Sequence, residues 1–349
     1  MLISRTPYRI SFFGGATDYP VWYQEQGAAL LATTINHYCY LHCRLLPAFF
    51  QHKSRVVWSQ IEEVLDHANI QHPSVRAVLT WLKFNQGIEI HHQGDLPART
   101  GLGSSSAFTV GLLNAIYTLQ NKETSKQQIA EEAIYLERDL LNESVGIQDQ
   151  ITTSYGGFNK IEIDTTGHFT VNPVALSQSR LRDFEEHLLL FFTGISRNAS
   201  NIAAEKIRSI PHKRQELEGL QKHVSQALKI LQGDHDLSEV GHLLHESWML
   251  KREICSSVST PFIDNLYQRA CQAGAVGGKL LGAGGGGFLL VFAKPENKEK
   301  IKIALSDLLE VPFHFESEGS QIVYNNAAHD ENLFLARRDY IHLEKTETG

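Results

Sequence analysis

The most constraining feature of the sequence is a small-residue segment, Pro97–Ala107, which reads Pro-Ala-Arg-Thr-Gly-Leu-Gly-Ser-Ser-Ser-Ala. Apolar residues recur at helical spacing from Phe108 to Leu119, which predicts a helix over Ser105–Leu119. Ser104–Ser106 would provide hydroxyls at the helix N-cap, and the glycines would let the backbone approach a ligand. The N–H groups of a first helical turn and the helix dipole together favour an anion. We interpret the segment as a phosphate-binding loop, with an ordinary capping loop as the alternative.

Length, charge and cysteine count set bounds on the class of protein. A chain of 349 residues predicts two domains, and its net charge of −7 argues against a nucleic-acid or anionic-membrane partner. Arg5 and Pro7 stand where a signal peptide needs an apolar core, and no apolar run reaches membrane-spanning length. Together with the low count of four cysteines, these features predict a cytoplasmic protein. Cys39 and Cys43 would share one strand face, where we favour plain strand residues over a metal pair.

Strand and helix patterns occur in blocks, without strict β-α-β alternation, which favours an α+β fold in two domains with a boundary near residue 183. The predicted strands are Arg9–Phe13, Ala28–Asn36, Tyr38–Leu45, Arg55–Ser59, Gly87–His92, Phe158–Ile163, Phe169–Val174, Leu188–Phe192, Val276–Leu281, Phe288–Phe292, Pro312–Phe315 and Gln321–Tyr324. The predicted helices are Pro73–Phe84, Ser105–Leu119, Ser125–Leu141, Ala199–Ser209, His212–Leu231, Leu237–Cys255, Pro261–Ala273 and Asn297–Leu309.

A second glycine-rich segment, Lys279–Phe288, reads Lys-Leu-Leu-Gly-Ala-Gly-Gly-Gly-Gly-Phe. It matches G-x-G-x-x-G literally, but the strand pattern of Phe288–Phe292 follows where a dinucleotide-binding motif requires a helix. A Walker A loop is excluded because Leu280 stands where that motif has Ser or Thr. Four consecutive glycines favour a backbone that approaches another loop or a ligand, with a merely structural turn as the alternative.

Three carboxylates occupy positions that could carry chemistry. Asp18 follows a Gly-Gly pair at the exit of the first strand, where a turn or helix-cap role is the alternative to ligand binding. Glu137 shares the predicted buried face of its helix with Leu140, so it should have a cation or metal partner. Asp149 lies in Gly-Ile-Gln-Asp-Gln after a predicted helix break. Taken singly, each carboxylate fits a structural role better than a catalytic one.

Taken together, these segments resemble the GHMP kinases, the small-molecule kinases related to galactokinase, homoserine kinase, mevalonate kinase and phosphomevalonate kinase. The resemblance covers residues 3–293 and rests on the order of Thr-Pro-Tyr-Arg, Gly-Gly-Ala-Thr-Asp-Tyr, Gly-Leu-Gly-Ser-Ser, Gly-Ile-Gln-Asp-Gln and Gly-Ala-Gly-Gly-Gly-Gly. Within this family the chain is most similar to the bacterial D-glycero-D-manno-heptose 7-phosphate kinases. The implied fold joins a ribosomal-protein-S5-like N-terminal domain (1–183) to a ferredoxin-like C-terminal domain (184–349) that carries the glycine-rich loop and a polar tail.

Residue by residue, the resemblance implies an ATP site, a magnesium site and an acceptor site. The residues implied in ATP binding are Pro97, Thr100, Gly101, Leu102, Gly103, Ser104, Ser105, Ser106, Gly284 and Gly285. Ser105 and Glu137 are implied as Mg²⁺ ligands, Asp149 as the catalytic base, and Arg9 as the cation that keeps Asp149 ionised and stabilises developing negative charge. The implied acceptor-binding residues are Gly14, Gly15, Thr17, Asp18, Arg197, Lys251 and Arg252.

The resemblance implies an ATP-dependent kinase that phosphorylates the anomeric C1 hydroxyl of heptose 7-phosphate, for the synthesis of nucleotide-activated heptose. Gly15-Ala16 stand where galactokinase has Glu-His, which weakens a plain galactokinase assignment. Two alternatives remain open at this point. The first is a kinase of the same family for an unphosphorylated sugar such as galactose or fucose, and the second is a non-catalytic regulator that binds ATP or sugar. The oligomeric state is also open, with a homodimer among the alternatives.

Overall fold

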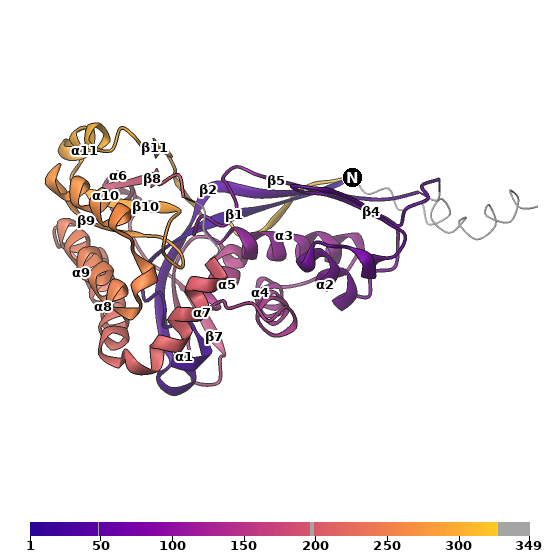
Figure 1. Cartoon of the computed structure of the whole chain (residues 1–349), viewed down its shortest axis with the longest axis horizontal. Helices are drawn as coiled ribbons and strands as arrows, with labels where there is room; N and C mark the ends of the chain where they lie inside the picture. Colours follow the sequence, from indigo (N-terminus) through magenta and orange to yellow (C-terminus); the bar gives the residue numbers. More distant parts are fainter. Residues whose placement is uncertain (48, 196–198, 327–349) are drawn as a thin grey trace, which may run out of the picture.

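The computed structural model describes residues 1–47, 49–195 and 199–326 and consists of two sheets with helices packed on them (Figure 1). The larger sheet has nine strands and the smaller has four, in the order β11-β8-β10-β9. The strands are β1 (Leu2–Phe13), β2 (Ala28–Leu45), β3 (Ser54–Val57), β4 (Ile61–Val64), β5 (Ile88–Gly94), β6 (Phe158–Ile163), β7 (Phe169–Pro173), β8 (Leu188–Phe192), β9 (Ala275–Leu280), β10 (Phe288–Ala293), β11 (Leu309–Glu310), β12 (Phe315–Glu316) and β13 (Gln321–Asn325).

Helices pack against both sheets, and α8 as well as α3 and α5 contacts β1 and β2 of the larger one (Figure 1). Helix α3 packs directly on β1 and β2, and α9 and α10 pack on β9. The α-helices are α1 (Pro20–Gln26), α2 (Pro73–Trp81), α3 (Ser104–Leu119), α4 (Lys126–Ile134), α5 (Gln148–Tyr155), α6 (Gln178–Glu186), α7 (Ala199–Ser209), α8 (Arg214–Gln232), α9 (Ser238–Ile254), α10 (Pro261–Gln272) and α11 (Lys298–Ala304). A π-helical segment, η2 (Tyr135–Leu140), continues α4.

Strand β2 organises the larger sheet because it pairs with different partners along its length. The first part of β2 pairs with β6 and its second part pairs with β5. On its other edge, β1 pairs antiparallel with both parts of β2. The sequence predicts two strands here, broken near His37, but β2 is continuous. Pro7 pairs with Tyr38 and Tyr8 pairs with Ile35, so the two intervening residues form a β-bulge that keeps the strand unbroken.

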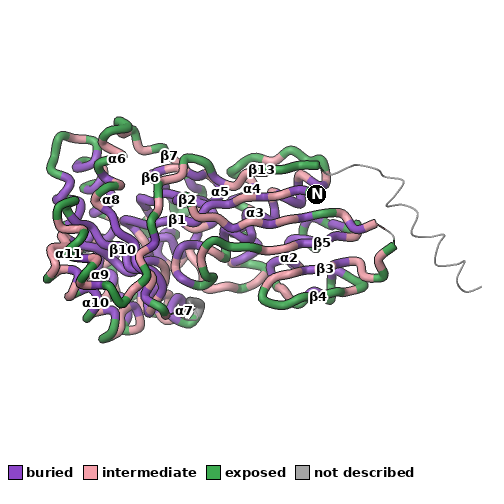
Figure 2. Tube along the Cα trace, turned by 90° about the horizontal axis from the view of Figure 1, so that it is seen from above, coloured by how far each residue is buried: buried purple, intermediate pink, exposed green. Residues whose placement is uncertain are grey.

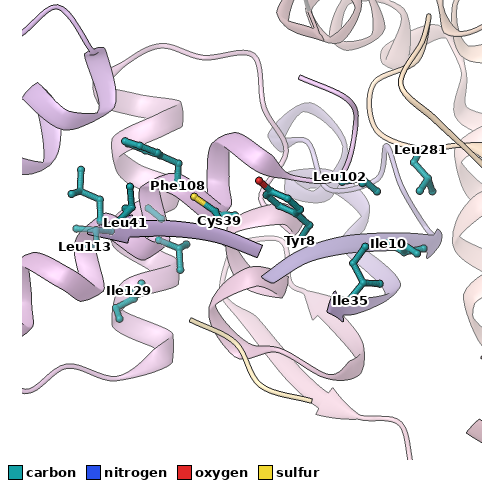
Figure 3. Close-up of a cluster of buried hydrophobic side chains, with 14 of the residues drawn as sticks. Tyr8, Ile10, Ile35, Cys39, Leu41, Leu102, Phe108, Leu113, Ile129 and Leu281 are labelled. Atoms are coloured by element: carbon teal, nitrogen blue, oxygen red, sulfur yellow. The ribbon is translucent and has the colours of Figure 1, made fainter. Parts of the chain in front are cut away.

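The core joins the two sheets into one packed unit (Figure 2). Side chains of β1, β2 and α3 meet between sheet and helix, as the close-up in Figure 3 shows for Tyr8, Leu41 and Phe108. The same cluster of buried side chains continues into the smaller sheet through Leu190 and Phe292. The other face of that sheet packs against α9 and α10, so β8 and β10 are buried on both faces and form continuous apolar runs.

Most predicted elements are confirmed to within a few residues, and several are wrong or missing. The strand predicted at Pro312–Phe315 begins only at Phe315, and the helix predicted over Asn297–Leu309 ends at Ala304. Helices α1, α5 and α6 and strands β4 and β11 were not predicted. The proposed boundary near residue 183 falls inside α6, and the chain later returns to the larger sheet through β12 and β13.

Cys39 and Cys43 are buried in the core on one face of β2, as predicted for plain strand residues. Within the described residues, no group of three or more His, Cys, Asp or Glu side chains could hold a metal ion by itself. A search of the same residues found no helix with the length and apolar character that crossing a membrane requires. The polar tail after residue 326 lies outside the described residues.

Candidate active site

The loop that leads into α3 is shaped by its glycines and not by serine caps. Gly103 is the N-cap residue and adopts a left-handed conformation, with φ of 75°. The predicted side-chain cap by Ser104–Ser106 is therefore wrong, because these serines already form the first helical turn. The Ser104 hydroxyl instead accepts a hydrogen bond from the Arg99 N–H (3.2 Å), and the Thr100 hydroxyl donates to the Pro97 carbonyl (2.7 Å). The N–H groups of this first turn have no intrahelical acceptor and face the loop, which suits an anion.

The second glycine-rich segment lies directly against this loop, so the predicted approach to another loop is confirmed. A Cβ added to Gly282 would lie 2.4 Å from the Cα of Gly101, and a Cβ added to Gly287 would lie 2.2 Å from the Thr100 carbonyl oxygen. Gly285, in the middle of the segment, donates its N–H to the Val258 carbonyl (2.9 Å). The two glycine-rich loops thus form one backbone surface between the two sheets.

Arg9 and Asp149 form a bidentate ion pair beside the first loop. The Arg9 Nε donates to Asp149 Oδ1 (2.7 Å) and its Nη2 donates to Oδ2 (2.6 Å), while Nη1 donates to the Gly101 carbonyl (2.6 Å). Arg9 is 4% exposed, whereas the Asp149 side chain, in the first turn of α5, is 29% exposed. A Cβ on Gly103 would come within 3.1 Å of Arg9 Cγ. The arginine is therefore fixed, and the carboxylate keeps an accessible side next to the loop.

Asp18 lies on the other side of this pair and holds the start of α5. Its Oδ2 accepts the Gln148 N–H (3.3 Å), its Oδ1 accepts the Ala16 N–H (3.2 Å), and a Cβ on Gly146 would overlap its carboxylate. Burial raises the pKa of Asp18, and the negative charge of Asp149 raises it further. The two carboxylates thus lie close enough to repel each other, in a region that also contains buried cations.

The remaining predicted residues of this first turn have local roles. Thr17 is buried, and both its hydroxyl (2.8 Å) and its N–H (3.1 Å) donate to the Gly14 carbonyl. These bonds close the turn that carries Asp18. A Cβ added to Gly15, the next residue after Gly14, would lie 3.4 Å from the Ser11 hydroxyl oxygen.

Glu137 is buried, as its helical spacing predicts, but it lies in the π-helical segment η2 and not in a regular α-helix. It is 0% exposed, and its Oε2 accepts hydrogen bonds from the Ser106 hydroxyl (2.9 Å) and from Gln150 Nε2 (2.6 Å). The π-turn changes the helical phase, so Leu140, predicted on the same buried stripe, is 45% exposed. The structure brings Ser106 against Glu137, whereas the predicted partner Ser105 is exposed.

The carboxylate of Glu137 fits a cation. Its Oε1 is buried and has no hydrogen-bond partner in the described part of the chain. Burial raises the pKa of Glu137 to about 7, although hydroxyl and amide donors around it oppose the shift. A buried oxygen with an open position, close to a loop suited to phosphates, is a donor of the kind that Mg²⁺ takes alongside phosphate oxygens.

Three lysines are buried near the Arg9–Asp149 pair. Lys251 Nζ donates to the carbonyls of Leu280 (3.0 Å) and Gly282 (2.7 Å), so it holds the second glycine-rich loop. Lys279 Nζ donates to the Phe12 carbonyl (2.8 Å), and burial lowers its pKa to about 7. Lys206, on the buried face of α7, was missed by the sequence reasoning. Its position three and four residues after buried apolar residues of the same helix was an available signal.

Of the other cationic predictions, Arg252 forms an ion pair with Asp264 of α10 (3.1 Å). Arg197 lies outside the described residues. The structure therefore brings together Arg9, Asp18, Asp149 and the loop residues Gly101–Gly103, and it adds Ser106 and Lys206 to the neighbourhood.

Comparison with known proteins identifies the family. The GHMP kinases N terminal domain matches residues 69–157, and the GHMP kinases C terminal domain matches residues 222–310. A D-glycero-alpha-D-manno-heptose 7-phosphate kinase of Campylobacter jejuni is 27% identical over 318 residues, which cover 86% of this chain and 92% of that protein. Both halves of the chain thus align with one class of kinase.

Solved structures share the fold. A D-glycero-D-manno-heptose 1-phosphate kinase from Bacteroides thetaiotaomicron superposes with a TM-score of 0.77 at 21% identity, over 94% of this chain and all (100%) of that chain. Galactokinase from Lactococcus lactis, complexed with galactose, superposes with a TM-score of 0.70 at 20% identity, over 92% of this chain and 94% of that chain. At these identities the two structures establish the fold alone. With both of its domains matched, this chain belongs to the GHMP kinase family and has the two-domain fold of that family.

Proposed function

We propose that this protein is an ATP-dependent sugar kinase that phosphorylates the C1 hydroxyl of D-glycero-D-manno-heptose 7-phosphate. The observation that carries the kinase chemistry is the Arg9–Asp149 pair, which lies beside the contact between two glycine-rich loops. The choice of acceptor is supported by the Campylobacter jejuni heptose 7-phosphate kinase, which aligns with 86% of this chain. The absence of Glu-His at Gly15-Ala16 also separates this chain from the galactokinase motif.

The chemistry follows from what phosphoryl transfer requires. The γ-phosphoryl group passes through a loose, charge-dispersed state, so positioning and electrostatic stabilisation provide most of the catalysis. The N–H groups at the start of α3 would hold the ATP phosphates. Asp149 would take the proton of the acceptor hydroxyl as its oxygen bonds to the γ-phosphorus and the bond to ADP breaks. Arg9 would hold the carboxylate of Asp149 in position, because it donates to both carboxylate oxygens.

The metal that such kinases use would be held by the Glu137 carboxylate, with the hydroxyl oxygen of Ser105 or Ser106 as a further ligand. Mg²⁺ supplies neutralisation of phosphate charge when it is bound. Glu137 is suited to that role because its Oε1 is buried without a hydrogen-bond partner among the described residues. Ser106 already touches Glu137, and Ser105 lies on the exposed side of the same helical turn.

An acceptor panel tests the proposal. ADP formation is measured with ATP and, at matched concentration, heptose 7-phosphate, the unphosphorylated heptose, galactose and fucose, and the product is located by phosphorus NMR. We expect heptose 7-phosphate to have the highest kcat/KM and to be phosphorylated at C1. Equal or better use of a free sugar would refute the heptose phosphate assignment, and phosphorylation at another position would refute C1.

A negative control separates the enzyme from contaminating kinases and from a regulator. The Asp149→Asn variant, purified in parallel, should form ADP about 10²- to 10⁴-fold more slowly than wild type with every sugar. If the wild-type protein binds ATP and sugar but also forms no ADP, the non-catalytic regulator would replace the kinase.

A further inference from the structure

Lys206 occupies a position where a lysine is rarely found. It lies on α7 and is 3% exposed, next to Ile202 and Ala203, which are buried on the same face of the helix. Lysine is almost never fully buried unless its ammonium has a partner. Burial lowers the pKa of Lys206, because the charged ammonium loses its contact with water at this position.

The surroundings of Lys206 belong to the proposed acceptor side of the site. Its Nζ lies 5.9 Å from the centre of the Tyr19 ring, and Tyr19 directly follows Asp18. The carboxylates of Asp18 and Asp149 both oppose the lowering of its pKa, so both are within electrostatic reach. The largest influences on the pKa of Glu137 come instead from its burial and from Thr109, Glu143, Ser106 and Gln150. The contact with the Tyr19 ring places Lys206 on the Asp18 side of the site.

The other buried cations of this neighbourhood already have acceptors. Arg9 is committed to Asp149 and to the Gly101 carbonyl. Lys251 donates to two carbonyls of the second glycine-rich loop, and Lys279 donates to the Phe12 carbonyl. Among the described residues, the ammonium of Lys206 makes no hydrogen bond, so its N–H groups are available to a ligand.

The basic character of this region points to the kind of ligand. Four buried basic side chains, Arg9, Lys206, Lys251 and Lys279, lie near two carboxylates, those of Asp18 and Asp149, among the described residues. Burial lowers the pKa of the three lysines, so an anionic or oxygen-rich ligand that enters the site would favour their charged forms. A sugar hydroxyl that carries developing negative charge, or a phosphate oxygen of the acceptor or of the group in transfer, would provide that partner.

We propose that Lys206 binds the acceptor, donating a hydrogen bond from its ammonium to an oxygen of the sugar substrate beside Asp18 and Asp149. This assignment rests on the proposed kinase function, but not on the identity of the sugar. In the transfer step, the proton of the acceptor hydroxyl passes to Asp149, its oxygen bonds to the γ-phosphorus, and ADP leaves. Lys206 keeps its own proton throughout and lowers the energy of the attacking oxygen by its positive charge.

The test compares Lys206→Met with Lys206→Arg, using ATP and whichever sugar of the acceptor panel the wild-type enzyme phosphorylates best. Methionine preserves length and removes the charge, so we expect kcat/KM for the sugar to fall about 10- to 100-fold. Affinity for ATP, measured by calorimetry without sugar, should not change. Arginine keeps the charge and should restore part of the activity. The exposed Lys222→Met on α8 is the matched control and should behave as wild type.

Thermal unfolding distinguishes acceptor binding from a structural role. Removal of a buried cation that makes no hydrogen bond within the described part of the chain should leave the melting temperature unchanged or raise it. A Lys206→Met variant with wild-type kcat/KM for the sugar would overturn the assignment, as would equal losses of ATP and sugar affinity or a lowered melting temperature with unchanged sugar KM. Failure of the wild-type enzyme on heptose 7-phosphate alone would refute the proposed substrate and leave this test intact.

Discussion

The contact between the two glycine-rich loops predicts a large effect for a single added methyl group. In Gly282→Ala, the new Cβ would lie 2.4 Å from the Cα of Gly101 and 3.0 Å from its carbonyl oxygen, in a residue with φ of 72°. Gly194→Ala is a matched control, because Gly194 has φ of 74° and nothing among the described residues lies within 4 Å of its added Cβ. The control isolates the cost of the left-handed backbone, and Gly282→Ala adds the collision.

The two contributions can be estimated separately. A left-handed conformation costs a residue with a Cβ about 1–2 kcal/mol, which both variants share. Forcing an extra methyl group into a packed site costs about 1–3 kcal/mol more, and only Gly282→Ala incurs it. The loops must also move apart, and the Gly282 carbonyl accepts a hydrogen bond from Lys251 that this movement would strain. We therefore expect weaker ATP binding in Gly282→Ala in addition to lower stability.

The assay is thermal unfolding and ATP titration of both variants beside wild type. Gly194→Ala should lose a little stability and bind ATP normally. Gly282→Ala should unfold at a clearly lower temperature and bind ATP more weakly. Equal melting temperatures for the two variants, or normal ATP affinity in a folded Gly282→Ala protein, would show that the loop contact does not form the nucleotide site.

Glycines and buried charges were the parts of the site that the sequence predicted best. Four consecutive glycines have few explanations other than a close backbone approach, and Gly287, the last of them, makes that approach against Thr100. The burial of Glu137 followed from helical spacing. Glu137 lies early in the π-helical segment, where the buried face still agrees with a period of 3.6 residues counted from α4. A π-turn has no comparable sequence signal. The sequence analysis paired Glu137 with Ser105, whereas the structure shows Ser106 as its neighbour.

Other misses have equally physical origins. Helix α5 is only eight residues long and carries Asp149 in its first turn, too short for periodicity to identify it. The continuity of β2 depends on a bulge set by pairing with β1, a long-range partner that local pattern does not contain. Lys251, whose binding of substrate stays a prediction, donates its ammonium to two loop carbonyls, a contact that no spacing rule could have identified.

Three further predictions concern the metal side and the base. Burial raises the pKa of Glu137 to about 7 from an ordinary value of 4.5, so between these pH values the folded state binds more protons than the unfolded state. Without Mg²⁺, the free energy of unfolding should therefore fall as the pH rises from 4.5 to 7, by up to about 3 kcal/mol. Glu137→Gln should remove this fall, and calorimetric unfolding from pH 4.5 to 8 measures it; a wild-type profile as flat as that of the variant would contradict the pKa. In a Mg²⁺ titration at fixed ATP, Ser106→Ala should raise the Mg²⁺ requirement more than Ser105→Ala if the contact with Glu137 persists, whereas the reverse order would favour Ser105 as the ligand. In Arg9→Met, loss of both bonds to Asp149 should lower kcat more than ATP affinity, and an unchanged kcat would remove Arg9 from the catalytic site.

The most direct test of the account is a single-turnover measurement of phosphoryl transfer in Asp149→Asn beside wild type, with ATP bound and the preferred sugar in excess. Asparagine keeps the shape of the side chain and one acceptor for Arg9 but cannot take the proton of the hydroxyl. The account predicts a transfer rate lowered by about 10²- to 10⁴-fold, with ATP affinity and melting temperature close to wild type. A folded Asp149→Asn protein that transfers the phosphoryl group within about fivefold of the wild-type rate would contradict it, because a general base contributes far more than that.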